Sequence, residues 1–170
     1  MDKVTEASYT YNEDGMVTEG KVYYDGELSY SYTREYNENG DLIEDVSVNY
    51  YDGEKHTSTT TYEITYGKGD QYESVIMTVD NGEESYEIEM VYEWDSDTEC
   101  TVTYEGKDAD EYYGEDSYAE MEMDKDGNVI SSTMYQDGEK VNEVTRTYQK
   151  LTKKQQEQMD QIAWIIDLFS

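Results

Sequence analysis

Between residues 86 and 94, aromatic and aliphatic side chains alternate with polar ones. The apolar positions are Tyr86, Ile88, Met90, Tyr92 and Trp94, and the glutamates between them are Glu87, Glu89 and Glu93. Successive side chains of a β-strand point to opposite faces, so a period of two is typical of a strand with one buried face. The segment therefore predicts a half-buried antiparallel strand whose glutamates face solvent.

The same alternation recurs around Tyr30 and Tyr62, where tyrosine and isoleucine alternate with serine, threonine and glutamate. Turn signals separate these runs at short, fairly even intervals, and most contain a glycine able to take a positive φ. They lie at residues 12–15, 25–26, 37–40, 52–53, 67–70, 81–82, 94–97, 126–127 and 137–138. Counting the runs predicts about ten strands, and such short connections favour a meander of sequence neighbours.

From Leu151 the apolar period changes to that of a helix. Thr152 and Gln155 form a capping box, and apolar residues then recur at helical spacing. These residues are Met159, Ile162, Ala163, Ile166 and Phe169, with Trp164, Ile165 and Leu168 beside them. Because so apolar a helix must be buried, we expect a strongly curved sheet or open barrel packed around it. A closed barrel, or a sandwich with the helix at one end, is the alternative.

Length and composition favour one all-β domain, residues 1–170, made of a sheet over 1–150 and a packing helix over 151–170. The 20 tyrosines and 2 tryptophans supply apolar area that a disordered chain of this hydropathy lacks. The chain contains no proline. This absence fits a chain that spends most of its length in hydrogen-bonded ladders.

The net charge is −30, and two lysines against three acids in residues 151–170 leave −29 on the predicted sheet. Such a charge disfavours direct binding to nucleic acid or to an anionic membrane surface. No apolar run is long enough for a transmembrane helix. Met1 is either the native start of a cytosolic protein or stands where an export signal has been removed.

Candidate chemistry is sparse. His56 is the single histidine and Cys100 the single cysteine, and an exposed histidine with a half-buried thiol is favoured over a catalytic pair. A His/Cys zinc site is also disfavoured, because carboxylates would have to complete its ligand set. The 42 acids make carboxylate pairs for glycoside hydrolysis uninformative. Residues 124–128 resemble the opening of a calcium loop but lack EF-hand spacing, so a hairpin turn is preferred. We therefore expect no enzyme activity, no cofactor and no metal site.

Three segments share a pattern near Tyr-Asp/Asn-x-x-Gly-x-Leu/Val. They begin at Tyr11, Tyr36 and Met123 and end in Val17, Leu42 and Val129. The segments resemble the YD-type hairpin repeats of bacterial cell-surface and polymorphic-toxin proteins, and cover about a third of the chain. Similar units occur in small bacterial lipoproteins, whose exported domain follows a lipid-bearing cysteine. The resemblance implies an extracellular or cell-surface location, with the cytoplasm as the alternative.

Exposed aromatic and acidic side chains are the binding candidates. Tyr112 and Tyr113 lie in the longest irregular stretch, an acidic loop at 106–116, and Tyr24 and Tyr51 lie at turns. Glu87, Glu89 and Glu93 represent the acidic strand face. We expect a non-enzymatic bacterial surface or exported domain, lipoprotein-like, that presents this face to a protein or glycan partner, basic if protein. The alternative is a cytosolic acidic inhibitor, an immunity protein or nucleic-acid mimic, that blocks a basic nucleic-acid-binding enzyme.

Overall fold

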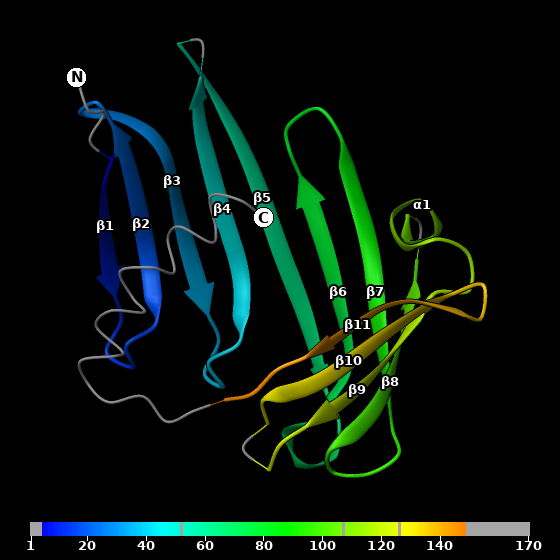
Figure 1. Ribbon diagram of the computed structural model, residues 1–170. Coiled ribbons are helices and arrows are strands. Elements are labelled where there is room, and N and C mark those ends of the chain that lie inside the picture. The colour runs from blue at the N-terminus through cyan, green and yellow to red at the C-terminus, as the bar shows by residue number, and fades with distance from the viewer. Residues whose placement is uncertain (1–4, 52, 107, 126, 149–170) are drawn as a thin grey trace.

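The structure is a computed structural model that describes residues 5–51, 53–106, 108–125 and 127–148. In this part of the chain, eleven strands form one antiparallel sheet in the order β1 to β11 (Figure 1). The strands are β1 (Thr5–Tyr11), β2 (Val17–Tyr24), β3 (Glu27–Tyr36), β4 (Leu42–Tyr51), β5 (Glu54–Tyr66), β6 (Tyr72–Asp80), β7 (Ser85–Trp94), β8 (Glu99–Glu105), β9 (Tyr118–Met123), β10 (Val129–Gln136) and β11 (Glu139–Thr145). The predicted all-β meander of about ten strands is confirmed.

Every strand reverses direction, so the turns alternate between two ends of the sheet. Turns after the odd-numbered strands lie at what we call the lower end, and turns after the even-numbered strands at the upper end (Figure 1). At the upper end, Asp25 and Gly26 have φ values of 52° and 83°, and Asp137 and Gly138 have 52° and 75°. Two consecutive positive φ angles define the tight hairpin that matches strand twist. The Asp-Gly signals in the sequence are explained by this geometry.

Three lower-end turns, at 12–16, 37–41 and 124–128, share one hydrogen-bond pattern. In each, the first residue's N–H donates to the fifth residue's carbonyl at 2.9 Å, and the glycine N–H donates to the first residue's carbonyl at 3.0–3.1 Å. The glycines take φ values of 83°, 88° and 83°. Each turn adjoins a register shift in its hairpin. The glycine at the fourth position therefore closes a hairpin with a bulge.

The register divides the side chains between two faces. One face, the inner face, carries Tyr32, Tyr62, Ile88 and Val102; the other, the outer face, carries mostly serine, threonine and glutamate. Ile88 is 1% exposed while its neighbour Glu87 is exposed, so the predicted alternation in β7 is confirmed. The buried apolar side chains are Tyr32, Val75, Ile88, Cys100, Val102 and Ala119 on the inner face, Val48 on the outer face, and Ala109.

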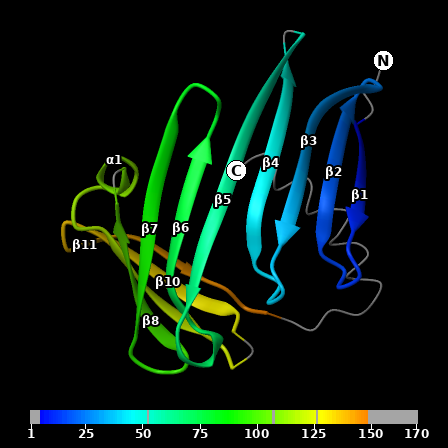
Figure 2. The same ribbon diagram turned by 180° about the vertical axis from the view of Figure 1, so that it is seen from behind.

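The sheet is open, and the expectation of a strongly curved sheet or open barrel is wrong. Among the described residues, β1 pairs with β2 alone and β11 with β10 alone, whereas closure requires the first and last strands to pair. The ordinary twist of neighbouring strands turns β8–β11 oblique to β1–β5 without rolling the sheet onto itself (Figures 1 and 2). The expectation rested on burying the helix predicted at 151–170, which lies outside the described residues.

The loop predicted at 106–116 contains a short helix, α1 (Ala109–Tyr113). α1 packs on β7 and β8. Asp108 anchors its start, because the Asp108 carboxylate accepts the Glu87 N–H at 2.8 Å and the Asp108 N–H donates to the Glu87 carbonyl at 3.3 Å. Ala109, 2% exposed, is buried by this packing. The acidic loop is therefore fixed to the sheet rather than projecting from it.

Candidate acidic binding face

The outer face of β7–β11 carries a row in which glutamate and threonine alternate from strand to strand. Directly opposed residues run Glu93, Thr101, Glu120, Thr133 and Glu143 across the five strands. Neighbouring strands lie about 4.8 Å apart, so the glutamates of this row stand about 10 Å apart. We call these five residues the acidic row.

A depression of about 480 Å³ on β8–β10 overlaps the acidic row, and further carboxylates border it. Its rim includes Asp95, Glu99, Glu120 and Glu122. The surface is hollowed here because the side chains between the acids are short: Thr101, Ser131 and Thr133. The lining therefore combines carboxylates with hydroxyl donors and acceptors.

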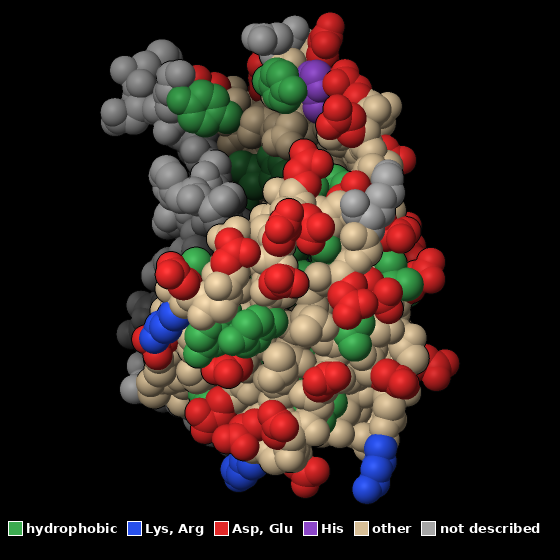
Figure 3. Space-filling view, turned by 90° about the vertical axis from the view of Figure 1, so that its right-hand side faces the viewer, with side chains coloured by type: hydrophobic (Ala, Val, Ile, Leu, Met, Phe, Trp, Pro, Cys, Tyr) green, Lys and Arg blue, Asp and Glu red, His purple; other side chains and the backbone are tan. Residues whose placement is uncertain are grey.

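Like charges face each other on these strands. Glu89 lies directly opposite Glu105, and Glu99 directly opposite Glu122. Opposed like charges destabilise a sheet, and β7, β8 and β9 contain no lysine or arginine to compensate. Asp and Glu side chains are scattered over the side of the molecule shown in Figure 3, and the Lys and Arg side chains seen there lie near its margins.

Where cations do meet acids among the described residues, they do so away from the depression. Lys21 pairs with Glu19 at 2.6 Å and Arg34 with Asp45 at 2.7 Å. On the acidic row itself, the Glu143 carboxylate forms an ion pair with the Lys140 ammonium at 2.6 Å. This pair shows in the protein itself how the row accommodates an ammonium group.

Glu120 is positioned by a tyrosine of the same face. The Tyr135 hydroxyl donates to Glu120 Oε2 at 3.0 Å, and the Tyr135 ring stacks on Tyr118 with centroids 4.7 Å apart. The hydrogen bond to the Glu120 carboxylate raises the pKa of Tyr135, which keeps its phenol protonated. The contact thus holds Glu120 in place through one of its two carboxylate oxygens.

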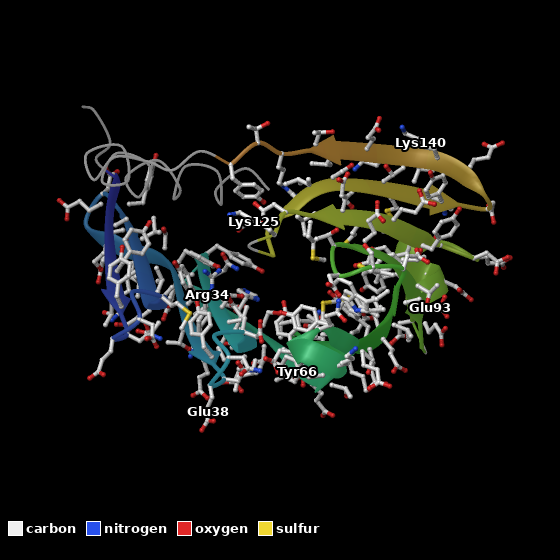
Figure 4. All side chains as sticks on the ribbon, turned by 90° about the horizontal axis from the view of Figure 1, so that it is seen from below. Arg34, Glu38, Tyr66, Glu93, Lys125 and Lys140 are labelled. Carbon is white, nitrogen blue, oxygen red and sulfur yellow. The ribbon has the colours of Figure 1, made fainter. Side chains whose placement is uncertain are left out.

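The predicted glutamates lie on the outer face, as expected from their alternation. Glu93 belongs to the acidic row, and Figure 4 places it on the outer side of the sheet, away from Arg34 on the inner side. Glu87 and Glu89 lie nearer the upper end of β7 and do not line the depression. Sequence reasoning missed Glu99, Glu120 and Glu122, although Tyr118–Met123 shows the same period of two.

The predicted tyrosines are not brought together with these glutamates. Tyr112 stacks on Tyr86 and Tyr113 on Tyr104, with centroids 4.2 and 4.1 Å apart, and both sheet partners belong to the inner face. Tyr112 is 54% exposed, whereas Tyr113 is half-buried. Tyr24 and Tyr51 are exposed at the upper end, separated by β3. The predicted residues therefore form several separate patches.

The single cysteine and the single histidine do not come together on this face. Cys100 is 2% exposed, and burial raises the pKa of its thiol to about 11, so the thiol is protonated at neutral pH. His56 lies on β5, which is not a neighbour of β8. Among the described residues, no cluster of His, Cys, Asp or Glu is arranged to hold a metal ion. Carboxylates and hydroxyls on this face suit the binding of ammonium and guanidinium groups.

Comparison with known proteins gave no family: no family model and no curated protein matches the chain. The helices within the described residues are too short to cross a bilayer. The class of the molecule is therefore defined by its fold and its outer face, as an open antiparallel meander with an acidic surface.

Proposed function

We propose that the chain is a non-enzymatic, lipoprotein-like binding domain of a bacterial surface or exported protein, which holds a basic segment of another protein against the acidic row. The observation that carries this proposal is the alternation of Glu93, Thr101 and Glu120 across neighbouring strands, next to a carboxylate-rimmed depression. An ammonium or guanidinium group placed there relieves the repulsion between opposed glutamates and hydrogen-bonds to the hydroxyls.

The spacing of the row selects the form of the segment. A segment in the extended polyproline II conformation has three residues per turn and rises about 3.1 Å per residue, so side chains three residues apart lie on the same side, about 9 Å from each other. That distance matches glutamates two strands apart in the acidic row. A segment with a lysine or arginine at every third position would therefore place each charge beside a carboxylate.

The proposed location is supported by the turns that resemble surface-protein repeats. The turns at 12–16, 37–41 and 124–128 share their hydrogen bonds. The strand contacts around two of them also correspond: the Tyr36 hydroxyl donates to the Val17 carbonyl and the Tyr148 hydroxyl to the Val129 carbonyl, each at 3.0 Å and across 19 residues. The first and last units of the sheet are thus built alike.

The alternative, a cytosolic acidic inhibitor of a basic nucleic-acid-binding enzyme, would use the same face. The opposed pairs Glu89–Glu105 and Glu99–Glu122 favour it, because they concentrate negative charge on a rigid sheet. Salt-sensitive inhibition of a nuclease by the protein would favour this alternative. Binding of basic segments with no nuclease inhibition would favour the surface domain.

The proposal is tested with a synthetic peptide that carries lysine at every third position. We expect calorimetry at low salt to show binding that weakens steeply as salt rises. A triple variant, Glu93→Gln, Glu120→Gln and Glu122→Gln, should bind the peptide roughly tenfold or more weakly, because it loses three surface charge contacts.

The matched control removes the same charge from the other half of the sheet, by Glu13→Gln, Glu27→Gln and Glu38→Gln. These three glutamates are exposed, and the control should bind the peptide as the parent protein does. Equal weakening in both triple variants would mean that net charge alone attracts the peptide, and would refute a site at the acidic row. A peptide of the same composition with its lysines clustered should bind less tightly.

A further inference from the structure

β1 forms one lateral edge of the sheet, at the opposite side from the acidic row (Figures 1 and 2). In the part of the chain that the structure describes, β1 pairs with β2 alone. Glu6, Ala7, Ser8 and Thr10 are all exposed, although Ala7 shares the inner face with Tyr30. A strand in this position presents a row of backbone N–H and C=O groups with which another strand can pair.

The residues that direct these backbone groups away from the sheet follow from the turn after β1. The Asn12 N–H donates across the turn at 2.9 Å, and the Thr10 carbonyl accepts a hydroxyl of β2 at 3.3 Å, so both residues face β2. Residues of an antiparallel strand alternate in this respect, and the register shift adds its extra residue to β2 rather than to β1. Ser8 therefore also faces β2, and Ala7 directs its N–H and carbonyl outward.

The two edges of the sheet differ in their protection against such pairing. β11 carries Glu139, Lys140 and Glu143 within seven residues, and a register shift disturbs its pairing with β10. Charged side chains, lysine above all, and bulges are the usual means by which proteins block an edge. The seven residues of β1 include one charged side chain, Glu6, and no lysine or proline. β1 is therefore the edge that can accept a further strand.

The distribution of charge also favours association at β1. One lysine against four acids leaves −3 on residues 5–24, whereas the whole chain carries −30. The acidic row begins six strands away, on β7, which is about 29 Å along the sheet at about 4.8 Å per strand. This distance exceeds three Debye lengths of about 8 Å each at physiological ionic strength. The charge concentrated on β7–β11 is therefore largely screened at β1.

We propose that β1 pairs antiparallel with β1 of a second copy of the chain, so that the two sheets become one. β1 is complementary to itself about a two-fold axis at Ser8: Ser8 faces the second copy's Ser8, Ala7 faces Tyr9, and Glu6 faces Thr10. All seven residues then have a partner, and no glutamate lies opposite another. The outward backbone groups of Ala7 also meet those of an alternate residue. Because the pairing occupies the β1 edge of both copies, it closes as a dimer.

Sedimentation equilibrium of the full chain measures this association. A seven-residue strand pair is a small interface, so we expect a dissociation constant on the order of 100 µM in about 0.5 M salt. The mean mass should rise with concentration from that of one chain toward that of two. Lowering the salt should weaken the dimer, because both copies are acidic. Peptide binding at the acidic row has the opposite salt dependence.

Oxidative cross-linking tests the register. Residues opposed in a non-hydrogen-bonded antiparallel pair have Cα atoms about 4.5 Å apart, within the range of a disulfide. Ser8→Cys should therefore give a disulfide-linked dimer under a mild oxidant, seen on a non-reducing gel. Thr10→Cys is the matched control and should not cross-link, because the two Thr10 positions lie about 14 Å apart in this register. Cys100 is 2% exposed and should remain reduced.

Ser8→Glu separates dimerisation from folding. Within one copy, Ser8 lies opposite Lys21, which accommodates a glutamate, whereas the dimer would place two glutamates face to face. This variant should weaken the dimer roughly three- to tenfold. Val141→Glu adds the same charge to β11, where Val141 is 52% exposed, and should leave the dimer unchanged.

The proposal is overturned if the parent protein remains monomeric at about 1 mM, well above the expected dissociation constant. It is also overturned if Ser8→Glu dimerises as the parent does, or if Thr10→Cys cross-links as readily as Ser8→Cys. The inference does not depend on the acidic row. Its failure would leave peptide binding there unaffected, so the two proposals are tested separately.

Discussion

At the scale of single residues, the first side chain of the lower-end turns at 12–16 and 37–41 holds the hairpin together. Asn37 Oδ1 accepts the N–H groups of Asn39 and Asp41, both at 2.9 Å, and its Nδ2 donates to the Tyr66 hydroxyl at 2.5 Å. Asn12 Oδ1 accepts the equivalent N–H groups at 3.1 and 2.9 Å. Asn37 therefore joins its turn to β5, whereas Asn12 serves its own turn.

Replacing these two residues by alanine separates the two roles. Asn12→Ala should lower the free energy of unfolding by about 1 kcal/mol, the usual value of a lost turn hydrogen bond. Asn37→Ala should cost more, about 2 kcal/mol, because the buried side of the Tyr66 hydroxyl also loses a partner. Urea denaturation of both variants measures the difference. An Asn37→Ala variant as stable as Asn12→Ala would show that the Tyr66 contact contributes nothing.

Cys100 gives the protein a predictable response to alkali. Burial raises the pKa of its thiol from 9.0 to about 11, so the folded state resists losing a proton that the unfolded chain releases. The corresponding stability is complete below about pH 9 and is lost as the pH rises toward 11. The fall in unfolding free energy between about pH 7.5 and 10.5 should therefore be smaller in Cys100→Ala than in the parent.

Urea denaturation of both proteins at the two pH values provides this comparison, and the tyrosines that titrate in the same range are common to both. In addition, the parent thiol should react with a disulfide reagent slowly when folded and rapidly in urea. Equal pH dependence of the two proteins would show that the Cys100 thiol is not protected by burial.

At the scale of elements, the lack of a side chain at one glycine lets an aromatic ring of the neighbouring strand lie directly over it. Gly20 on β2 lies opposite Tyr32 on β3, and a methyl group built on Gly20 would come within 2.4 Å of the Tyr32 ring. Tyr32 is only 7% exposed, and the Arg34 guanidinium lies over its ring at 4.4 Å from the centroid. The Tyr32 ring thus covers Gly20 and is itself covered by the Arg34 guanidinium.

Gly20→Ala should therefore destabilise the sheet by about 1–3 kcal/mol, the usual cost of overpacking. In a Tyr32→Ala background the same substitution should cost less than about 0.5 kcal/mol, because alanine suits a strand better than glycine does. A double-mutant cycle in urea measures this coupling. If Gly20→Ala costs the same free energy of unfolding in both backgrounds, the contact with the Tyr32 ring is not the cause of the destabilisation.

Local patterns predicted the elements better than their arrangement. The period of two in 86–94 and the Asp-Gly turns predicted β7 and the tight hairpins, because both depend on neighbouring residues alone. The five-residue helix α1 was missed because one turn and a half of helix shows no periodicity. The acidic row was missed because it depends on the register of five strands, and bulges shift that register in the β9–β10 and β10–β11 pairs.

At the scale of the whole molecule, charge is the dominant property. A net charge of −30 repels itself more strongly in the folded sheet than in the expanded chain. Sodium chloride at about 0.5 M should therefore raise the free energy of unfolding by screening that repulsion. Urea denaturation at several salt concentrations measures the effect. Destabilisation by salt would mean that ion pairs such as Arg34–Asp45 outweigh the repulsion.

The same charge should steer basic partners to the protein, and under our proposal the register of the outer face determines where they bind. That face supplies hydroxyls and carboxylates at a spacing that suits an extended basic segment. The position of the bound segment is therefore the central claim, more than its affinity.

Amide chemical-shift mapping of the protein during titration with the lysine-every-third-residue peptide tests that claim most directly. The account predicts saturable shifts concentrated at Thr101, Glu120 and Thr133 on β8–β10, which diminish as salt is added. Shifts spread evenly over the acidic surface, or confined to the inner face around Tyr112, would contradict it.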